Sequence, residues 1–110
     1  LIEKGADVNA SDSDSFTPLH NTIRCNNLAI AELLISRGAN VNARASENGL
    51  TPLHDAAWFG YCDMIRLLLK HGASESLKME TFMNYKTPLG MAIWCKRDAA
   101  AELLRSYGAQ

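Results

Sequence analysis

Histidine, aspartate and cysteine side chains are the groups in this sequence that could support catalysis. His54 and Asp55 are adjacent, and together with Cys25 they have the composition of a hydrolytic triad. The sequence contains neither a nucleophile elbow nor an oxyanion-hole motif, and acyl-transfer chemistry needs such features. We therefore predict that the chain is not an enzyme and has no catalytic residue.

The cysteines are equally unsuited to metal binding. Cys25, Cys62 and Cys95 are too far apart to form a Cys-x-x-Cys pair, and no histidine lies at metal-ligand spacing from them. We expect no metal and no cofactor, and we expect the thiols to be small buried or half-buried apolar groups. An odd number of scattered cysteines fits a reducing compartment, so we predict an intracellular protein of the cytoplasm or nucleus.

The charge balance excludes two classes of partner. The 110 residues include 11 Lys and Arg against 12 Asp and Glu, which gives a net charge of -1. Such a chain lacks the basic footprint of a nucleic-acid-binding domain or of a domain that binds anionic membranes. No apolar run approaches the roughly 20 residues that a membrane-spanning helix needs. We expect a protein or peptide partner, no nucleic acid and no membrane insertion.

The histidines belong to a segment that recurs along the chain, and this repeat defines its organisation. Thr-Pro-Leu-His begins at Thr17 and Thr51, and Thr-Pro-Leu-Gly begins at Thr87, so the motif returns after 34 and then 36 residues. A Gly-Ala pair separates the motifs, at Gly5, Gly38, Gly72 and Gly108. Each Thr precedes the next Gly by 21 residues, whereas the Gly-to-Thr segments vary from 12 to 15. Each unit therefore has one part of fixed length and one variable part.

Each fixed part is predicted to be a pair of short helices. Thr caps a helix by accepting a backbone N–H, and Pro suits the first helical position. Apolar stripes with i, i+3, i+4 spacing follow each Thr: Leu19, Thr22, Ile23; Leu53, Ala56, Ala57; and Leu89, Ala92, Ile93. The first helices should end at Asn26, Gly60 and Lys96, and the second helices at Gly38 or Gly72. Helices this short are unstable alone, so neighbouring units must stabilise one another.

These units resemble ankyrin repeats over essentially the whole chain. The likeness rests on the Thr-Pro-Leu-His starts, the Leu-rich second helices that end in Gly-Ala, and the hairpin runs at residues 7–10 and 40–43. The resemblance implies an all-α solenoid of helix-turn-helix units with β-hairpin-like fingers and a concave face. It also implies that Asn9 and Asn42 are similar to asparagines that a factor-inhibiting hydroxylase modifies.

The repeat boundaries define a single ankyrin-type domain over residues 1–110. We place the tail of a preceding repeat at 1–10 and three repeats at 11–43, 44–76 and 77–110, in a monomeric fragment of a longer chain. Asp98 and Arg105 put polar side chains where the earlier second helices are apolar, which predicts a C-terminal capping repeat. The last finger, from Ser74 to Lys86, is long and apolar, so it either folds back onto the domain or contacts a partner.

The histidines have a structural explanation in this arrangement. His20 and His54 each follow Thr-Pro-Leu, where the imidazole can hydrogen-bond to the backbone of its own unit and of the adjacent one. Their shared position favours a scaffold role over metal binding or general-base catalysis.

Candidate partner-binding residues lie on the side of the first helix opposite its apolar stripe, together with His54 and Asp55. Arg24, Trp58 and Trp94 each lie seven residues after a capping Thr, so they should line up across the repeats. In ankyrin domains this side and the finger tips form the concave surface. The resemblance therefore implies that a partner binds to Phe16, Arg24, Leu50, Trp58, Phe59, Met83, Lys86 and Trp94. Alternatively, the two indoles only fill gaps between repeats.

The sequence thus predicts a protein-protein interaction module that binds a peptide or folded partner through its concave face. One alternative is a structural spacer within a larger multidomain protein. Another is a methyl-lysine peptide reader, in which Trp58, Phe59 and Trp94 form an aromatic cage around the cation.

Overall fold

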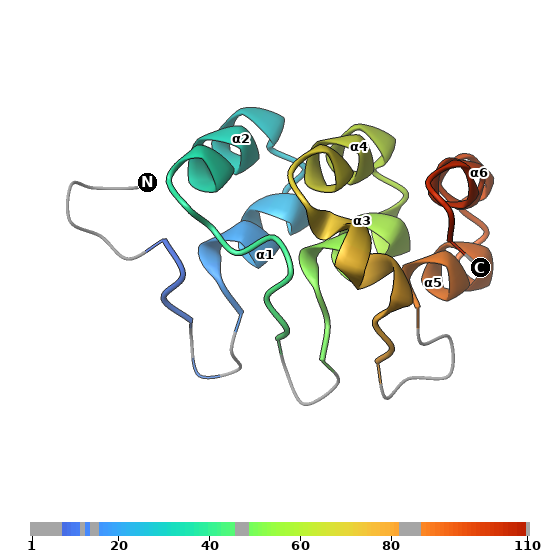
Figure 1. The fold of residues 1–110 in the computed structure, drawn as a ribbon, viewed down its shortest axis with the longest axis horizontal. Coiled ribbons are helices and arrows are strands. Elements are labelled where there is room, and N and C mark those ends of the chain that lie inside the picture. The colour runs from blue at the N-terminus through green and yellow to red at the C-terminus, as the bar shows by residue number, and fades with distance from the viewer. Residues whose placement is uncertain (1–7, 12, 14–15, 46–48, 82–86, 110) are drawn as a thin grey trace.

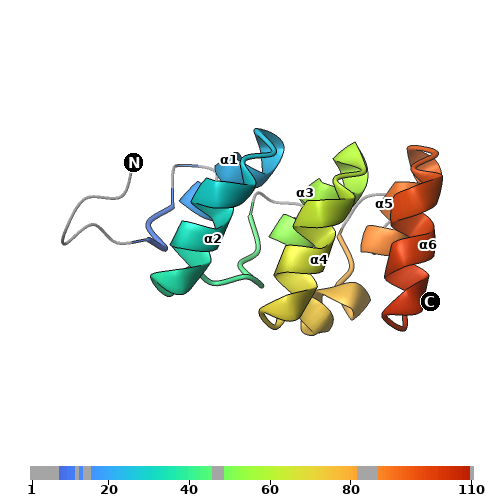
Figure 2. The same ribbon diagram turned by 90° about the horizontal axis from the view of Figure 1, so that it is seen from above.

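Three helix pairs stand side by side in the computed structural model of the chain, which describes residues 8–11, 13, 16–45, 49–81 and 87–109 (Figure 1). The first helices of the pairs form one layer: α1 (Pro18–Arg24), α3 (Pro52–Phe59) and α5 (Pro88–Trp94). The second helices form the other: α2 (Leu28–Ser36), α4 (Cys62–Lys70) and α6 (Asp98–Ser106). The pairs follow one another along the longest of the three dimensions, 39 × 26 × 21 Å (Figure 2). This arrangement confirms the predicted all-α solenoid.

Capping threonines start the first helices, as the sequence predicts. The hydroxyls of Thr17, Thr51 and Thr87 each accept the backbone N–H three residues later. At the first two sites the side chain of the third helical residue, His20 or His54, accepts the N–H of the capping Thr in return. This reciprocal pair satisfies two donors that a helix start otherwise leaves unpaired.

The predicted helix ends are also confirmed. Asn26, Gly60 and Lys96 follow the first helices with φ of 53°, 73° and 58°, the left-handed region that turns the chain. Gly38 and Gly72, with φ of 94° and 102°, follow the second helices. A lysine therefore adopts at the end of α5 the conformation that a glycine adopts at the end of α3.

The apolar core runs continuously through all three repeats. Leu19, Ile23, Leu53, Ala56 and Ala57 are fully buried, because α3 packs against α1 on one side and α5 on the other. The second-helix layer is packed in the same way, with α4 between α2 and α6. Each helix pair is thus covered by its neighbours rather than by a separate hydrophobic centre.

Asparagine side chains join the repeats at the bases of the fingers. The Asn9 amide donates to the Gly38 carbonyl, and the Asn42 amide donates to the Gly72 carbonyl, both at 3.1 Å. The side-chain oxygen of Asn42, Oδ1, accepts a hydrogen bond from the hydroxyl of Ser76. Ser76 occupies the position in the third finger that corresponds to Asn9 and Asn42. These bonds would have to open before either amide could enter the active site of a modifying enzyme.

The fingers differ from one another. In the second, Ala45 and Leu50 form an antiparallel bridge with backbone bonds of 2.6 and 2.8 Å, which is the predicted hairpin pairing. The third begins instead with a 3-10 helix, η1 (Ala73–Lys78), that packs against α3, α4 and α5 and buries Leu77. This part of the third finger therefore folds back onto the domain, which is one of its two predicted arrangements, and forms no hairpin pairing among its described residues.

At the C-terminal end of the stack, one residue of the predicted core is exposed. Ile93 continues the apolar stripe of the first helices, yet 52% of its surface is exposed, because no later repeat covers it among the described residues. On α6, Asp98 and Arg105 are exposed, as expected of a polar outer face. In the described ranges no helix has the length and apolar character needed to cross a membrane.

Candidate protein-interaction surface

His20 and His54 are buried links between repeats, as predicted. The Nδ1 atom of each ring accepts the N–H of its capping Thr, so the proton resides on Nε2. From Nε2, His20 donates to the carbonyl oxygen of Leu50 and His54 to that of Met79, both at 3.0 Å. With both nitrogens engaged, neither ring can act as a base without breaking a link. No cluster of potential metal ligands occurs in the part of the chain that the structure describes.

Asp55 departs from the expected exposure of this side of α3. Only 5% of its surface is accessible, and burial raises the pKa of its carboxyl to about 6, although the nearby Arg24 lowers it. The side chain lies between repeats, so the prediction that it shares an open face with Trp58 is wrong. Its Oδ2 atom lies 3.4 Å from Arg24 Nε without forming a hydrogen bond.

Arg24 is held at the junction of the first two repeats. Its guanidinium carbon lies 4.0 Å from the centre of the Phe16 ring, at the base of the first finger, while Nε faces Asp55 on α3. The side chain remains 37% exposed. Sequence position alone identifies Arg24 as a surface residue, but the ion pair depends on the distance between α1 and α3.

The aromatic residues of α3 and α5 differ in exposure. Trp58 is half-buried, whereas Trp94 is 61% exposed. Phe59 is 36% exposed, and its ring stacks on that of Tyr61 at 5.3 Å between centres, with an interplanar angle of 13°. Arg24, Trp58 and Trp94 occupy the same position in three adjacent helices of one layer, as predicted. We refer to Phe16, Arg24, Trp58, Phe59 and Trp94 as the first-helix surface.

Leu50, another predicted site residue, does not extend this surface. Leu50 is buried, and its backbone is used by the bridge to Ala45 and the bond from His20. Met83 and Lys86 lie outside the described residues.

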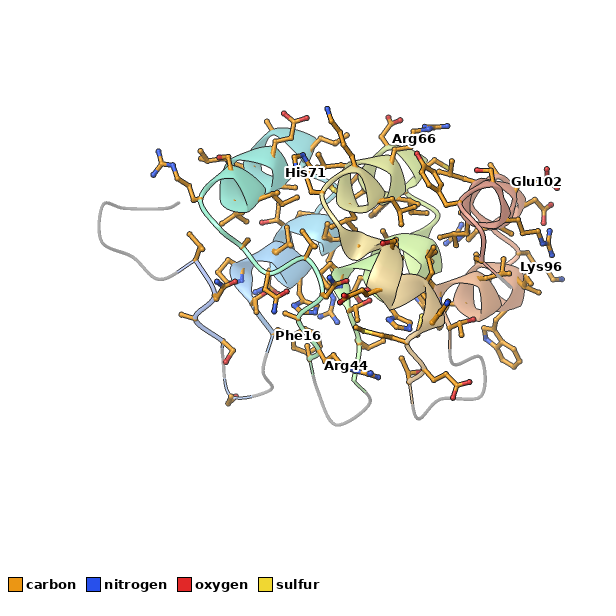
Figure 3. All side chains as sticks on the ribbon, viewed as in Figure 1. Phe16, Arg44, Arg66, His71, Lys96 and Glu102 are labelled. Carbon is orange, nitrogen blue, oxygen red and sulfur yellow. The ribbon has the colours of Figure 1, made fainter. Side chains whose placement is uncertain are left out.

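Arg44 joins two fingers and was not among the predicted site residues. Its Nε donates to the Gly49 carbonyl at 3.1 Å and its Nη2 donates to the Glu80 carbonyl, so it joins the second and third fingers. Figure 3 shows Phe16 and Arg44 below the first helices, on the side to which the fingers extend, whereas Arg66, His71 and Glu102 lie around the second helices. No sequence signal marks Arg44, because it lies in the segment of variable length.

The cysteines form no site. Cys25 is exposed, which corrects the expectation that all three thiols are covered, while Cys62 and Cys95 are half-buried. Burial raises the pKa of the Cys95 thiol, although Arg97 opposes the change. A thiol with a raised pKa is a poor nucleophile at neutral pH.

Comparison with known proteins agrees with the repeat structure. A family model described as Ankyrin repeats (3 copies) matches residues 1–79. The B-cell lymphoma 3 protein homolog of Mus musculus is 39% identical over 79 residues, which cover 71% of this chain and 17% of that protein. The human SMC5-SMC6 complex localization factor protein 1 is 35% identical over 74 residues, covering 67% of this chain and 7% of that protein.

The third repeat is included in a further match. The tyrosine-protein kinase Shark of Drosophila melanogaster is 32% identical over 107 residues, which cover 97% of this chain and 11% of the kinase. The chain thus corresponds to less than a fifth of each of these relatives. Ankyrin-repeat domains are typically non-catalytic and generally mediate protein-protein interaction. The family model, the stacked helix pairs and the repeated capping motifs agree that the chain belongs to the ankyrin-repeat family.

Proposed function

We propose that this chain binds a peptide or a folded protein through the first-helix surface, which corresponds to the concave face of an ankyrin solenoid. The observation that carries the proposal is the alignment of Arg24, Trp58 and Trp94 at one position of three neighbouring helices. A partner lying across the repeats would meet these side chains in succession.

The residue types support the same proposal. Trp and Arg are the side chains most enriched among residues that dominate binding energy at interfaces. Trp94 leaves most of its indole accessible, although burying an indole is strongly favourable. The exposed part of the ring is therefore available to a partner that lies across the repeats.

The methyl-lysine alternative has weaker support. An aromatic cage needs several rings that converge on one cation. One face of Phe59 is instead occupied by Tyr61, and the positive charge of Arg24 lies on the neighbouring helix, where it repels a cationic ligand. The spacer alternative makes a different prediction, because a spacer would have no binding site at Trp94.

Selection of ligands from a displayed library of random linear peptides tests the proposal. Synthetic versions of the selected peptides would be titrated against wild type, Trp94→Ala and Tyr107→Ala, with circular dichroism confirming that each variant is folded. Tyr107 is a matched control, because it is an aromatic residue of similar exposure, 48%, that follows α6 in the second-helix layer.

We expect Trp94→Ala to weaken binding by about 30-fold or more, which is the effect of losing one dominant aromatic contact of about 2 kcal/mol. Tyr107→Ala should leave the Kd within about twofold. Equal effects of the two substitutions, or no effect of Trp94→Ala, would show that the first-helix surface is not the binding site and would favour the spacer. A preference for methylated over unmodified lysine peptides would favour the reader.

A further inference from the structure

Two contacts from different repeats fix the guanidinium group of Arg24. The Phe16 ring supports its flat face at 4.0 Å, and Asp55 of the following repeat lies 3.4 Å from Nε. A long side chain usually loses conformational freedom when it binds, at a cost of about 0.5–1.5 kcal/mol. Because these contacts already restrict Arg24, much of that cost is met before a partner arrives.

The restricted group keeps unused hydrogen-bond donors. A guanidinium carries five N–H donors, and the one on Nε faces Asp55. No hydrogen bond from an Nη group is found among the residues that the structure describes. The pair of Nη donors matches the two oxygens of a carboxylate, and the 37% exposure of the side chain leaves it accessible.

Asp55 does not compete for those donors. It is 95% buried by residue surface, and its Oδ2 has almost no accessible surface, so it cannot itself bind a partner. Asp55 is therefore a positioning residue that orients Arg24 from the Nε side. A buried carboxylate is unfavourable for folding, which argues against a purely stabilising role for the pair.

Arg44 and Glu80 are two charged side chains that the fingers carry besides the Arg24 site. The guanidinium of Arg44 lies on the same side of the molecule as Phe16 (Figure 3), and its Nε and Nη2 atoms already donate to carbonyl oxygens. Glu80 on the third finger is exposed. Arg24 therefore supplies the cationic group of the first-helix surface at the first repeat, and Trp94 supplies the most exposed aromatic group at the third.

We propose that Arg24 selects a partner segment carrying an aspartate or glutamate side chain, at a fixed distance from an apolar side chain that packs on Trp58 or Trp94. The proposal rests on the function proposed above. Packed helices lie about 10 Å apart, which an extended peptide crosses in about three residues. The acidic residue should therefore lie about three residues from an apolar residue at Trp58, or about six from one at Trp94.

The test uses the peptides selected from the random library, each paired with a version in which Asp or Glu is replaced by its amide. Both versions would be titrated against wild type, Arg24→Gln, Arg24→Lys and Arg66→Gln. Arg66 is the matched control, because it also pairs with an aspartate, Asp63 at 3.0 Å, but lies in the second-helix layer (Figure 3). Arg24→Lys keeps the charge and serves if Arg24→Gln does not fold.

Wild type and Arg66→Gln should bind the acidic peptide about tenfold more tightly than its amide. This ratio should fall to about one in Arg24→Gln and to about threefold in Arg24→Lys, since a lysine lacks the paired donors. The inference is overturned if the ratio is one in wild type, or if it persists in both Arg24 variants. Binding that depends on Trp94 without an acidic preference would refute this inference alone, whereas the absence of any Trp94-dependent peptide would refute the proposed function as well.

Discussion

The Nε2 atom of His54 lies 3.0 Å from the carbonyl oxygen of Met79, so a buried imidazole joins the second repeat to the base of the third finger. His20 and Leu50 form the same link one repeat earlier. Gly90 occupies the equivalent position in the third repeat, where no later finger is present among the described residues. Among the three repeats, the histidine is therefore found in the two in which its Nε2 atom can donate a hydrogen bond to the following finger.

We expect His54→Leu to lower the free energy of unfolding by about 2–4 kcal/mol, because both the Thr51 N–H and the Met79 carbonyl lose a buried partner. Urea denaturation followed by circular dichroism measures the change. His71→Leu is the control, since this exposed residue caps the end of α4, and its effect should stay within about 0.5 kcal/mol. Equal losses in the two variants would contradict the link.

Asp55 should make stability fall as pH rises from about 4 to 6. Its carboxyl has a pKa of about 6 in the folded chain against 3.8 as the ordinary value, so the folded state binds more protons in this window. A difference of about two pKa units corresponds to about 3 kcal/mol. Relative to Asp55→Asn, wild type should lose roughly this amount of unfolding free energy between pH 4 and pH 7 in parallel denaturation series.

The Arg24→Gln variant provides a second test of the pH dependence that is assigned to Asp55. Arg24 lowers the pKa of Asp55, so Arg24→Gln should extend the loss to higher pH. A constant difference between wild type and Asp55→Asn across this range, or a difference that grows in favour of wild type, would show that Asp55 is not a buried carboxyl.

Lys96→Gly should raise the free energy of unfolding by about 0.5–1 kcal/mol. Lys96 is exposed and has φ of 58°, a conformation that costs a residue with a Cβ but not glycine. Lys70→Gly is the matched control, because it places the same change within the last turn of α4, where glycine should lower stability by a similar amount. Thermal unfolding of the two variants would reveal opposite shifts, and a lower melting temperature for Lys96→Gly would contradict the prediction.

The sequence was sufficient for features set by local chemistry. A threonine before proline caps a helix wherever it occurs, and Asn26 or Gly60 turns the chain because of its own backbone preferences. These residues fix the helix bounds and, through the 3.6-residue period, the shared position of Trp58 and Trp94.

Features set by contacts between repeats were less predictable. Asp55 is polar and was expected to be open, but the packing of α3 between α1 and α5 covers it and brings it to Arg24. Ile93 is apolar and continues a buried stripe, but burial needs a neighbour, and no later repeat covers α5 among the described residues. The helix η1 was missed because residues 73–78 have no periodic pattern long enough to indicate it.

A partner that lies on the first-helix surface would change the chemical environment of the backbone amides beneath it. Backbone amide chemical shifts of the 15N-labelled chain, recorded while a selected peptide is added, report this directly. We predict that the largest shifts occur in α1, α3 and α5 around Arg24, Trp58 and Trp94, and that α2, α4 and α6 shift little on their outer faces. Shifts concentrated on those second helices would contradict the account.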